Sequence, residues 1–476
     1  MITFFGAIAL LITGYFLYGH VVEKVFRPEE KPTPAVAHPD GVDYVPMKTW
    51  RVFLIQLLNI AGTGPIFGAL MGAVFGPVVF LWIVFGSILG GAVHDYMTGM
   101  ISLRMNGASV SEIVGEYLGC TAKQVMRVFS VVLLILVGAV FTTSPAALIA
   151  RLTPAWMDAT FWIVVILAYY LLATLLPIDK LIGKLYPFFG AVLIVMAVGI
   201  IVGLIAGGYQ LPELALANQH PSGQPVWPFM FITVACGAIS GFHATQSPMM
   251  ARCLKREKDG RKVFYGAMLT EGIIALVWAA AGVAFYGATG GLEAALDELS
   301  PSGVVYDISI SAMGVAGGAL AVIGVVVCPV SSGDTAFRSA RLTIADWFHI
   351  DQSKLGKRLA VTLPLLAIGA LLTQLDFDIV WRYFSWSNQT LAMIVLWSAA
   401  MYLARHARKW WYSLICALPA VFMSGVSSTY ILMADEGFRI AQNIAYPIGI
   451  AFALACAFLF LVKASSRKNQ RLHRQL

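Results

Sequence analysis

Charged side chains are scarce in this sequence. Asp, Glu, Lys and Arg make up only 12% of its 476 residues, whereas hydrophobic residues make up 59%. A soluble globular protein is about 25% charged, so the composition excludes a soluble enzyme or binding domain. It predicts instead an all-α polytopic membrane protein.

Cysteine is also sparse, and its pattern excludes the usual cysteine-based sites. The six cysteines are scattered, and none forms a CxxC pair or a zinc-ligand spacing. We expect them to be small buried apolar residues. The first apolar segment has no basic stretch before it and no small-residue cleavage signal, so it is interpreted as a retained helix rather than a signal peptide.

Long apolar runs dominate the rest of the chain. They predict about 13 membrane spans, at residues 3–22, 52–75, 77–102, 126–150, 159–177, 187–208, 229–251, 263–288, 304–330, 359–373, 383–404, 411–433 and 441–462. With the N-terminus outside, all but three of the 32 Lys and Arg residues fall in inner loops or the C-terminal tail. This positive-inside bias predicts a cytoplasmic C-terminus. It also explains the net charge of +7 without a nucleic-acid partner.

Two of the predicted spans break at their centres. The residues concerned are Gly62, Thr63, Gly64 and Pro65 in the first, and Gly237, Ser240, Gly241, Phe242 and His243 in the second. Glycine and proline weaken a helix, and freed backbone groups in a membrane need new partners. Such breaks predict a substrate site with exposed main-chain dipoles. The alternative is a proline kink with glycines for close helix packing, and a hydrogen-bonded structural role for His243.

The breaks fall in the second and seventh predicted spans, five spans apart, which predicts an internal repeat with a unit of five spans. Because five is odd, the second copy is inserted upside down, as in the 5+5 inverted-repeat transporters. The predicted units are residues 1–51 (first helix and linker), 52–208 (first repeat), 209–228 (outer loop), 229–404 (second repeat) and 405–476 (two further helices and a basic tail).

Besides His243, three ionisable residues lie at membrane depth, where a charge costs roughly 2.5–3.5 kcal/mol on insertion scales. His94 and Asp95 lie in the third span, and Glu271 lies in the corresponding span of the second repeat. We interpret them as ion-coupling residues, with Asp95 beside His94 as a site for a proton or sodium and Glu271 as a carrier of a proton. The alternative is a structural role, such as an ion pair between Asp95 and Arg104.

Further polar groups follow the ninth span and enter the eleventh. Ser331, Ser332 and Asp334 offer hard oxygen ligands for Na⁺, although Asp334 is also placed to pair with Arg338 at the start of a helix. Asn388 is interpreted as lining the substrate cavity or as bonding between helices. Ser109 and Glu112 have the spacing of a capping box for a short helix.

These motifs resemble the carbon starvation protein family, typified by CstA. The matching stretches are Asn59–Gly76, Gly91–Gly119, Cys236–Pro248 and Ser332–Arg338, spread over roughly residues 1–460. The resemblance implies an APC-type, LeuT-like fold and uptake of peptides during nutrient starvation; some relatives are proton-coupled pyruvate importers. The stretch after His243 and the smaller number of C-terminal spans differ from long family members, which leaves the substrate open.

We therefore expect a secondary transporter, not an enzyme, in the bacterial inner membrane. Its substrate carries a carboxylate, as a short peptide or pyruvate does, and binds between the two breaks. A proton is the expected coupling ion, with sodium near the second and ninth spans as the alternative. No cofactor or metal is expected, because His94, Asp95 and His243 lack a metal-binding spacing. A channel would need a continuous polar pore, and a duplicated core with breaks at the centres of two spans argues against one. Besides the substrate, membrane lipid is the only expected partner. The sequence does not indicate an oligomeric state.

Overall fold

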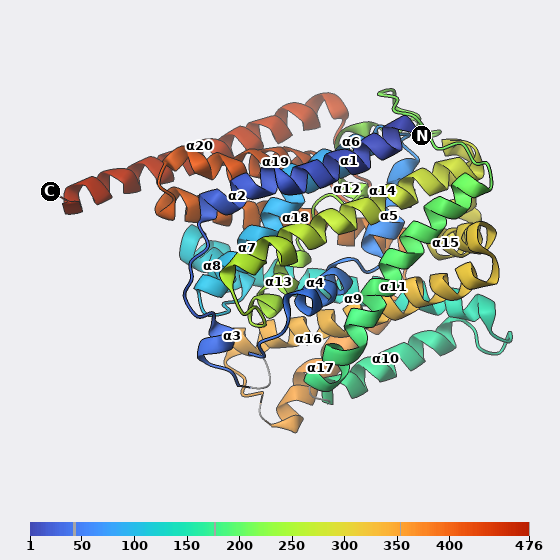
Figure 1. Cartoon of the computed structure of the whole chain (residues 1–476), viewed down its shortest axis with the longest axis horizontal. Coiled ribbons are helices and arrows are strands. Elements are labelled where there is room, and N and C mark those ends of the chain that lie inside the picture. Colours follow the sequence, from blue (N-terminus) through green and yellow to red (C-terminus); the bar gives the residue numbers. More distant parts are fainter. Residues whose placement is uncertain (41–43, 176–177, 353, 476) are drawn as a thin grey trace.

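The chain folds into a bundle of helices. The computed structural model describes residues 1–40, 44–175, 178–352 and 354–475, and these residues contain helices and turns but no strand. Figure 1 shows the longest helices running in broadly similar directions through the bundle. The all-α prediction is confirmed.

The helices of the first part of the chain end at about residue 206. They are α1 (Ile2–Phe16), α2 (Tyr18–Phe26), α3 (Pro34–Ala37), α4 (Thr49–Ile60), α5 (Gly64–Ala73), α6 (Val79–Leu81), the π-helix η1 (Trp82–Gly91), α7 (Ala92–Arg104), α8 (Val110–Leu118), α9 (Cys120–Leu152), α10 (Ala159–Leu175) and α11 (Ile178–Ala206). The capping box at Ser109 and Glu112 opens α8, as predicted. The predicted span at 159–177 ends in residues 176–177, which lie outside the described residues.

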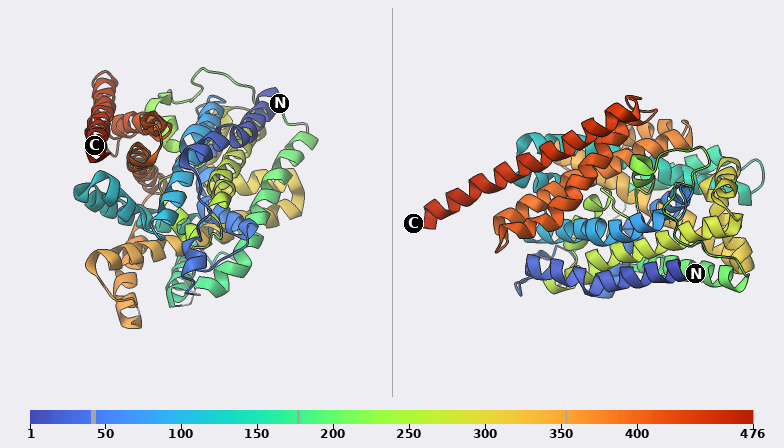
Figure 2. Two further views of the ribbon diagram at one scale, coloured as in Figure 1. Left: turned by 60° about the vertical axis from the view of Figure 1, so that its left-hand side comes forward. Right: turned by 90° about the horizontal axis from the view of Figure 1, so that it is seen from above.

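A loop without Lys or Arg leads into the second part. Its elements are η2 (Val226–Met230), α12 (Phe231–Thr233), α13 (His243–Ala251), η3 (Glu257–Asp259), η4 (Arg261–Tyr265), α14 (Gly266–Tyr286), α15 (Thr289–Val322), η5 (Ile323–Val327), α16 (Cys328–Phe348), α17 (Leu355–Leu372), α18 (Phe377–His406), η6 (Trp410–Ser413), α19 (Leu414–Met433) and α20 (Gln442–Gln475). Figure 2 shows α20 beside α19 on one flank, with its C-terminal end extending past the bundle.

Many of these helices suit a membrane. Among the described residues, nine helices are long and apolar enough to cross one, and α4 with α5 would make a tenth if that bent pair is a single span. The protein is therefore a multi-pass membrane protein. Four predicted spans are not among the nine found in the described residues: the two broken ones, the span at α10, whose apolar helix is shorter, and the span at α18, which is long enough but not apolar enough.

Both predicted breaks are present. Helices α4 and α5 meet at an angle of 50° across residues 61–63. The second break is longer, because residues 234–242 are non-helical between α12 and α13. Residues 55–70 and 234–244 are buried throughout. The interrupted segments therefore lie inside the bundle rather than against lipid, which fixes the position of the candidate site.

Candidate functional site at the two helix breaks

The two breaks touch each other through glycine. A Cβ added at Gly64, the first residue of α5, would lie 2.5 Å from Cys236 Sγ in the second break. A Cβ added at Gly237, which has a φ of +86°, would lie 2.5 Å from Ala275 Cβ and 3.5 Å from Pro65 Cβ. Only glycine permits this backbone conformation and this approach. The structure thus brings together residues that are more than 170 positions apart in the sequence.

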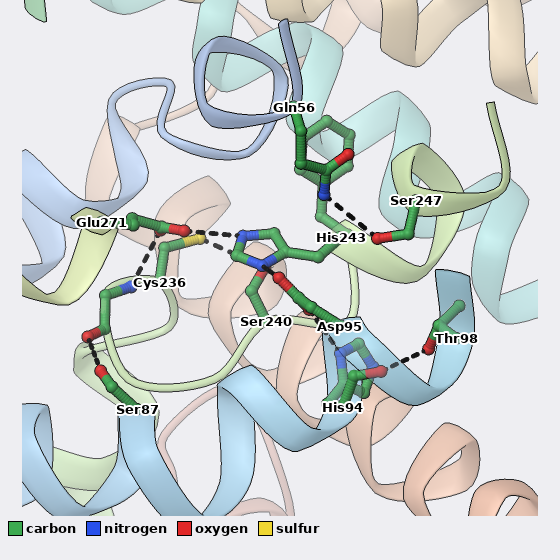
Figure 3. Close-up of polar contacts among 12 residues, drawn as sticks. Gln56, Ser87, His94, Asp95, Thr98, Cys236, Ser240, His243, Ser247 and Glu271 are labelled. Carbon is green, nitrogen blue, oxygen red and sulfur yellow. Dashed lines mark hydrogen bonds and ion pairs between the residues drawn. The ribbon is translucent and has the colours of Figure 1, made fainter. Parts of the chain in front are cut away.

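Four ionisable side chains form a continuous chain beside this contact (Figure 3). His94 Nδ1 lies 2.8 Å from Asp95 Oδ1, and Asp95 Oδ2 lies 2.9 Å from His243 Nδ1. On the other side of that ring, His243 Nε2 lies 3.4 Å from Glu271 Oε2. All four side chains are fully buried. Residues predicted separately for two different roles therefore belong to one cluster, built from α7, α13 and α14.

The cluster is tied to the main chain of the second break. The Gly237 N–H donates to Glu271 Oε1 at 3.0 Å, and the Ser87 hydroxyl of η1 donates to the Gly237 carbonyl at 2.8 Å. A buried main-chain group without a partner is costly, so these two bonds hold the non-helical peptide in place. Glu271 therefore contacts the main chain of the break directly.

Asn388 of α18 holds the other end of the same break. Its Oδ1 accepts the Phe242 N–H at 2.7 Å and the Ser240 hydroxyl at 3.2 Å, and its Nδ2 donates to the Ala235 carbonyl at 2.8 Å. The side-chain amide is therefore engaged by the broken segment. Gly241 also lies against α18, where an added Cβ would be 2.3 Å from the Asn388 carbonyl oxygen.

Near the first break, buried polar atoms lack partners. Among the described residues, Asn59 Oδ1, Thr63 Oγ1 and Gln56 Oε1 are buried without a hydrogen bond. Gln56 Nε2 donates to Ser247 Oγ at 3.2 Å and so links α4 to α13. Unsatisfied buried polar groups require an explanation in a native structure, and a polar ligand or water bound here would supply the missing bonds.

Aromatic rings close one side of the breaks. The Phe242 ring packs edge-on against Phe141 of α9, with centroids 6.2 Å apart. A Cβ added at Gly62 would lie 2.7 Å from Phe141 Cζ. Phe141 therefore contacts both breaks.

Ser331, Ser332 and Asp334 lie within α16 rather than after a span. Ser332 Oγ donates to the Leu58 carbonyl of α4 at 3.3 Å, and Ser331 Oγ donates to the Cys328 carbonyl at 2.7 Å. The predicted pairing of Asp334 with Arg338 is present, with Oδ2 3.3 Å from Nη2. The alternative interpretation placed Asp334 at the start of a helix. That position is wrong, because α16 begins at Cys328 and follows η5 without a loop. Asp334 Oδ1 has no hydrogen bond.

The alternative pairing of Asp95 with Arg104 is also wrong. Arg104 donates to the Tyr402 hydroxyl at 2.9 Å and lies 3.2 Å from Glu257 Oε2. Arg104 ends α7, two and a half turns after Asp95, so the two side chains lie at different depths of the bundle. Asp95 instead finds both of its partners in imidazole rings.

Three residues of the site were missed in the sequence. Cys236 was grouped with the other buried cysteines, although it lies inside a predicted break. Ser87 and Gln56 are single polar residues within apolar helices, and that isolation is the signal that marks them. Periodicity alone does not tell which neighbour such a residue meets.

A separate polar cavity of ≈ 280 Å³ adjoins α5, the half-helix that follows the first break. Its polar lining includes His220, Glu293, Asp297, Asp378, Arg382 and Ser385. The Arg382 guanidinium is 3.2 Å from Glu436, which balances its charge. The remaining carboxylates make this cavity net acidic.

Comparison with known proteins gives a consistent family assignment. The profile of the carbon starvation protein CstA family matches residues 1–157 and 147–290. An uncharacterized membrane protein of Haemophilus influenzae is 44% identical over 60% of this chain and 91% of its own length. The peptide transporter CstA of Bacillus subtilis is 28% identical over 92% of this chain and 90% of its own. The pyruvate/proton symporter BtsT of Escherichia coli is 30% identical over 57% of this chain, and this match spans 47% of BtsT.

Solved transporter structures share the fold. A manganese transporter of Eremococcus coleocola aligns with a TM-score of 0.54 at 13% identity, over 90% of this chain and 99% of its own. The inward-facing structure of Mhp1 aligns with a TM-score of 0.52 at 14% identity, over 92% of each chain. At such low identity the likeness concerns the arrangement of helices alone.

Proposed function

Because the chain belongs to the carbon starvation protein CstA family, we propose that it is a secondary active transporter. It imports a small carboxylate-bearing nutrient, a short peptide or pyruvate, across the bacterial inner membrane as part of the response to carbon starvation. The names of its relatives, peptide transporter CstA and the pyruvate/proton symporter BtsT, support this assignment. They also agree with transport rather than catalysis.

The architecture that we propose is the 5+5 inverted repeat, with residues 52–208 and 229–404 as its two halves. In this arrangement residues 1–51 and 405–476 add one span before and two spans after the core, for 13 spans in all. The N-terminus lies outside and the basic tail inside. The similarity to Mhp1 in fold and the presence of a break in each half support this arrangement.

Coupling to a proton is supported by one observation above all, the position of His243 between two carboxylates. A neutral imidazole carries one N–H, so it donates to either Asp95 or Glu271 but not to both. Adding a proton at Nε2 or at Glu271 Oε2 fills the 3.4 Å contact between them with a hydrogen bond. The cluster therefore has a defined place for one additional proton, next to the main chain of the break.

Sodium coupling is the alternative, but the contacts of Asp334 argue against a Na⁺ site there. Asp334 Oδ1 is a free buried oxygen close to the α4 contact made by Ser332. The Arg338 guanidinium already lies 3.3 Å from the same carboxylate. A second cation there would be repelled by this charge, so we assign Asp334 and Arg338 a structural role.

The acidic cavity bears on the choice of substrate. A peptide carries an ammonium group as well as a carboxylate, whereas pyruvate is a plain anion. Glu293, Asp297 and Asp378 line the cavity beside α5, and they attract the ammonium group but repel pyruvate. If this cavity is the entrance, as the proposed topology requires, a short peptide is the better-matched substrate.

Uptake into proteoliposomes tests the proposal. Labelled dipeptide and labelled pyruvate are supplied in parallel, each under an imposed pH gradient, an imposed Na⁺ gradient, or neither. We expect saturable uptake of one substrate that follows the pH gradient and disappears when an ionophore dissipates it. Absence of gradient-driven uptake of either substrate would contradict the proposed function.

A further inference from the structure

Three metal-ligating side chains converge at the second break. Cys236 Sγ, His243 Nε2 or Nδ1, and one Glu271 oxygen all lie within 4.8 Å of one another. The three side chains are 1%, 0% and 0% exposed, respectively. Figure 3 shows the sulfur, the imidazole and the carboxylate pointing toward one another from the non-helical segment, the start of α13 and α14.

The surroundings orient these atoms as they would in a metal site. His243 Nδ1 faces Asp95 Oδ2 at 2.9 Å, so a hydrogen on Nδ1 leaves the Nε2 lone pair directed at Glu271. A metal-binding histidine usually donates its second ring N–H to a carboxylate in this manner. Glu271 is fixed similarly, because its Oε1 accepts the Gly237 N–H. His243 Nε2 and Glu271 Oε2 are left as buried atoms without a hydrogen bond.

We propose that Cys236, His243 and Glu271 bind one thiophilic divalent cation of the Zn²⁺ class, and that its binding arrests the transport cycle. Zn²⁺ accepts sulfur, nitrogen and oxygen ligands together, whereas Mg²⁺ and Ca²⁺ prefer oxygen. Tetrahedral Zn²⁺ bonds imply ligand atoms about 3.5 Å apart. His243 Nε2 and Glu271 Oε2 are already about this far apart, at 3.4 Å. Binding therefore requires mainly that Cys236 Sγ approach them by about 1 Å.

Arrest follows from the atoms that the cation uses. It joins the second break to α14, and it occupies the two atoms between which the proposed coupling proton binds. Metal ligands must be deprotonated, so binding releases protons and weakens as the pH falls. This inference shares two residues with the proposed function, but metal binding itself requires no transport and is measured separately.

The binding test uses the purified full-length chain after removal of bound metals. Co²⁺ serves as the spectroscopic substitute for Zn²⁺, and Mg²⁺ is the hard-cation control. We expect one Co²⁺ per chain, a thiolate-to-metal charge-transfer band, and displacement of that band by Zn²⁺ but not by Mg²⁺. A wild-type protein that shows no thiolate band at saturating Co²⁺ overturns the proposal.

Matched cysteine variants locate the site. Cys236→Ser is expected to abolish the band and to weaken Zn²⁺ binding at least tenfold. Cys328→Ser changes another fully buried cysteine, on α16, and is expected to leave both unchanged. An intact band in Cys236→Ser, or its loss in Cys328→Ser alone, places the metal elsewhere and overturns the assignment.

Uptake measurements test the arrest. Zn²⁺ at concentrations that saturate binding is expected to stop uptake by the wild type and by Cys328→Ser, while any uptake that remains in Cys236→Ser resists it. The block is expected to weaken when the external pH is lowered. Uninhibited wild-type uptake at saturating Zn²⁺ overturns the arrest, and this outcome is distinct from a protein that transports neither test substrate.

Discussion

Replacing Asn388 with leucine is expected to release the second break. The substitution removes the acceptor of the Phe242 N–H and the donor to the Ala235 carbonyl, at 2.7 and 2.8 Å, and substitutes an apolar side chain. Both main-chain groups are then left unsatisfied in a buried setting. Each unsatisfied group costs about 1–3 kcal/mol, so the two together cost about 2–6 kcal/mol.

This energy corresponds to a roughly 30-fold to 10⁴-fold change in the equilibrium between the hydrogen-bonded conformation of the second break and its released conformation, since every 1.4 kcal/mol is a factor of ten. Two measurements report it: the thermal unfolding midpoint in detergent, and the rate at which a maleimide alkylates Cys236, located by peptide mass spectrometry. We expect a lower midpoint and faster alkylation in Asn388→Leu.

Thr390→Val, two residues further along α18, is the matched control. The Thr390 hydroxyl bonds to Ser427 and does not contact the break, so its loss is expected to cost only about 1 kcal/mol and to leave Cys236 protected. If Asn388→Leu is no less stable and no more reactive than Thr390→Val, the structural role of Asn388 is refuted. Loss of uptake without either change would favour its originally predicted role as a substrate ligand.

Other predictions address coupling, packing and the ion. Glu271→Gln and Asp95→Asn are expected to abolish uptake driven by a pH gradient while preserving exchange of substrate across the membrane; unchanged gradient-driven uptake in both variants would reject the proton assignment. Gly91→Ala places a Cβ 2.3 Å from the Ala238 carbonyl oxygen and should destabilise the protein by about 1–3 kcal/mol, whereas Gly90→Ala, whose added Cβ would lie 3.6 Å from Ile239 Cδ1, should be nearly neutral in thermal unfolding. Replacing Na⁺ by choline at a constant pH gradient should not change the uptake rate, and a strong dependence on Na⁺ would instead support the sodium alternative.

The breaks were predictable because their cause is local. Pro65 lacks an N–H and Gly237 adopts a positive φ, and both properties belong to the residue itself. The capping box at Ser109 and Glu112 was predictable for the same reason, since its two hydrogen bonds span only three residues. Local chemistry thus determined the ends and interruptions of helices.

The partners within the site were not predictable, because they depend on how distant helices pack. His94, Asp95 and Glu271 were recognised as unusual from their depth in the membrane, but nothing in the sequence joined them to His243 in one cluster. Arg104 was a possible partner of Asp95 in the sequence, but in the folded chain Asp95 contacts two imidazole rings instead. The number of spans stays a prediction, since a broken span has neither the length nor the hydropathy of a continuous one.

The contact between Gly64 and Cys236 limits which residues the crossing of the two breaks can accept. The Cys236 side chain fills the space that a side chain on Gly64 would need, since an added Cβ would lie 2.5 Å from Sγ and 2.6 Å from Cβ. A larger residue at either position would therefore push the two breaks apart. Two positions far apart in the sequence must in this way stay small together.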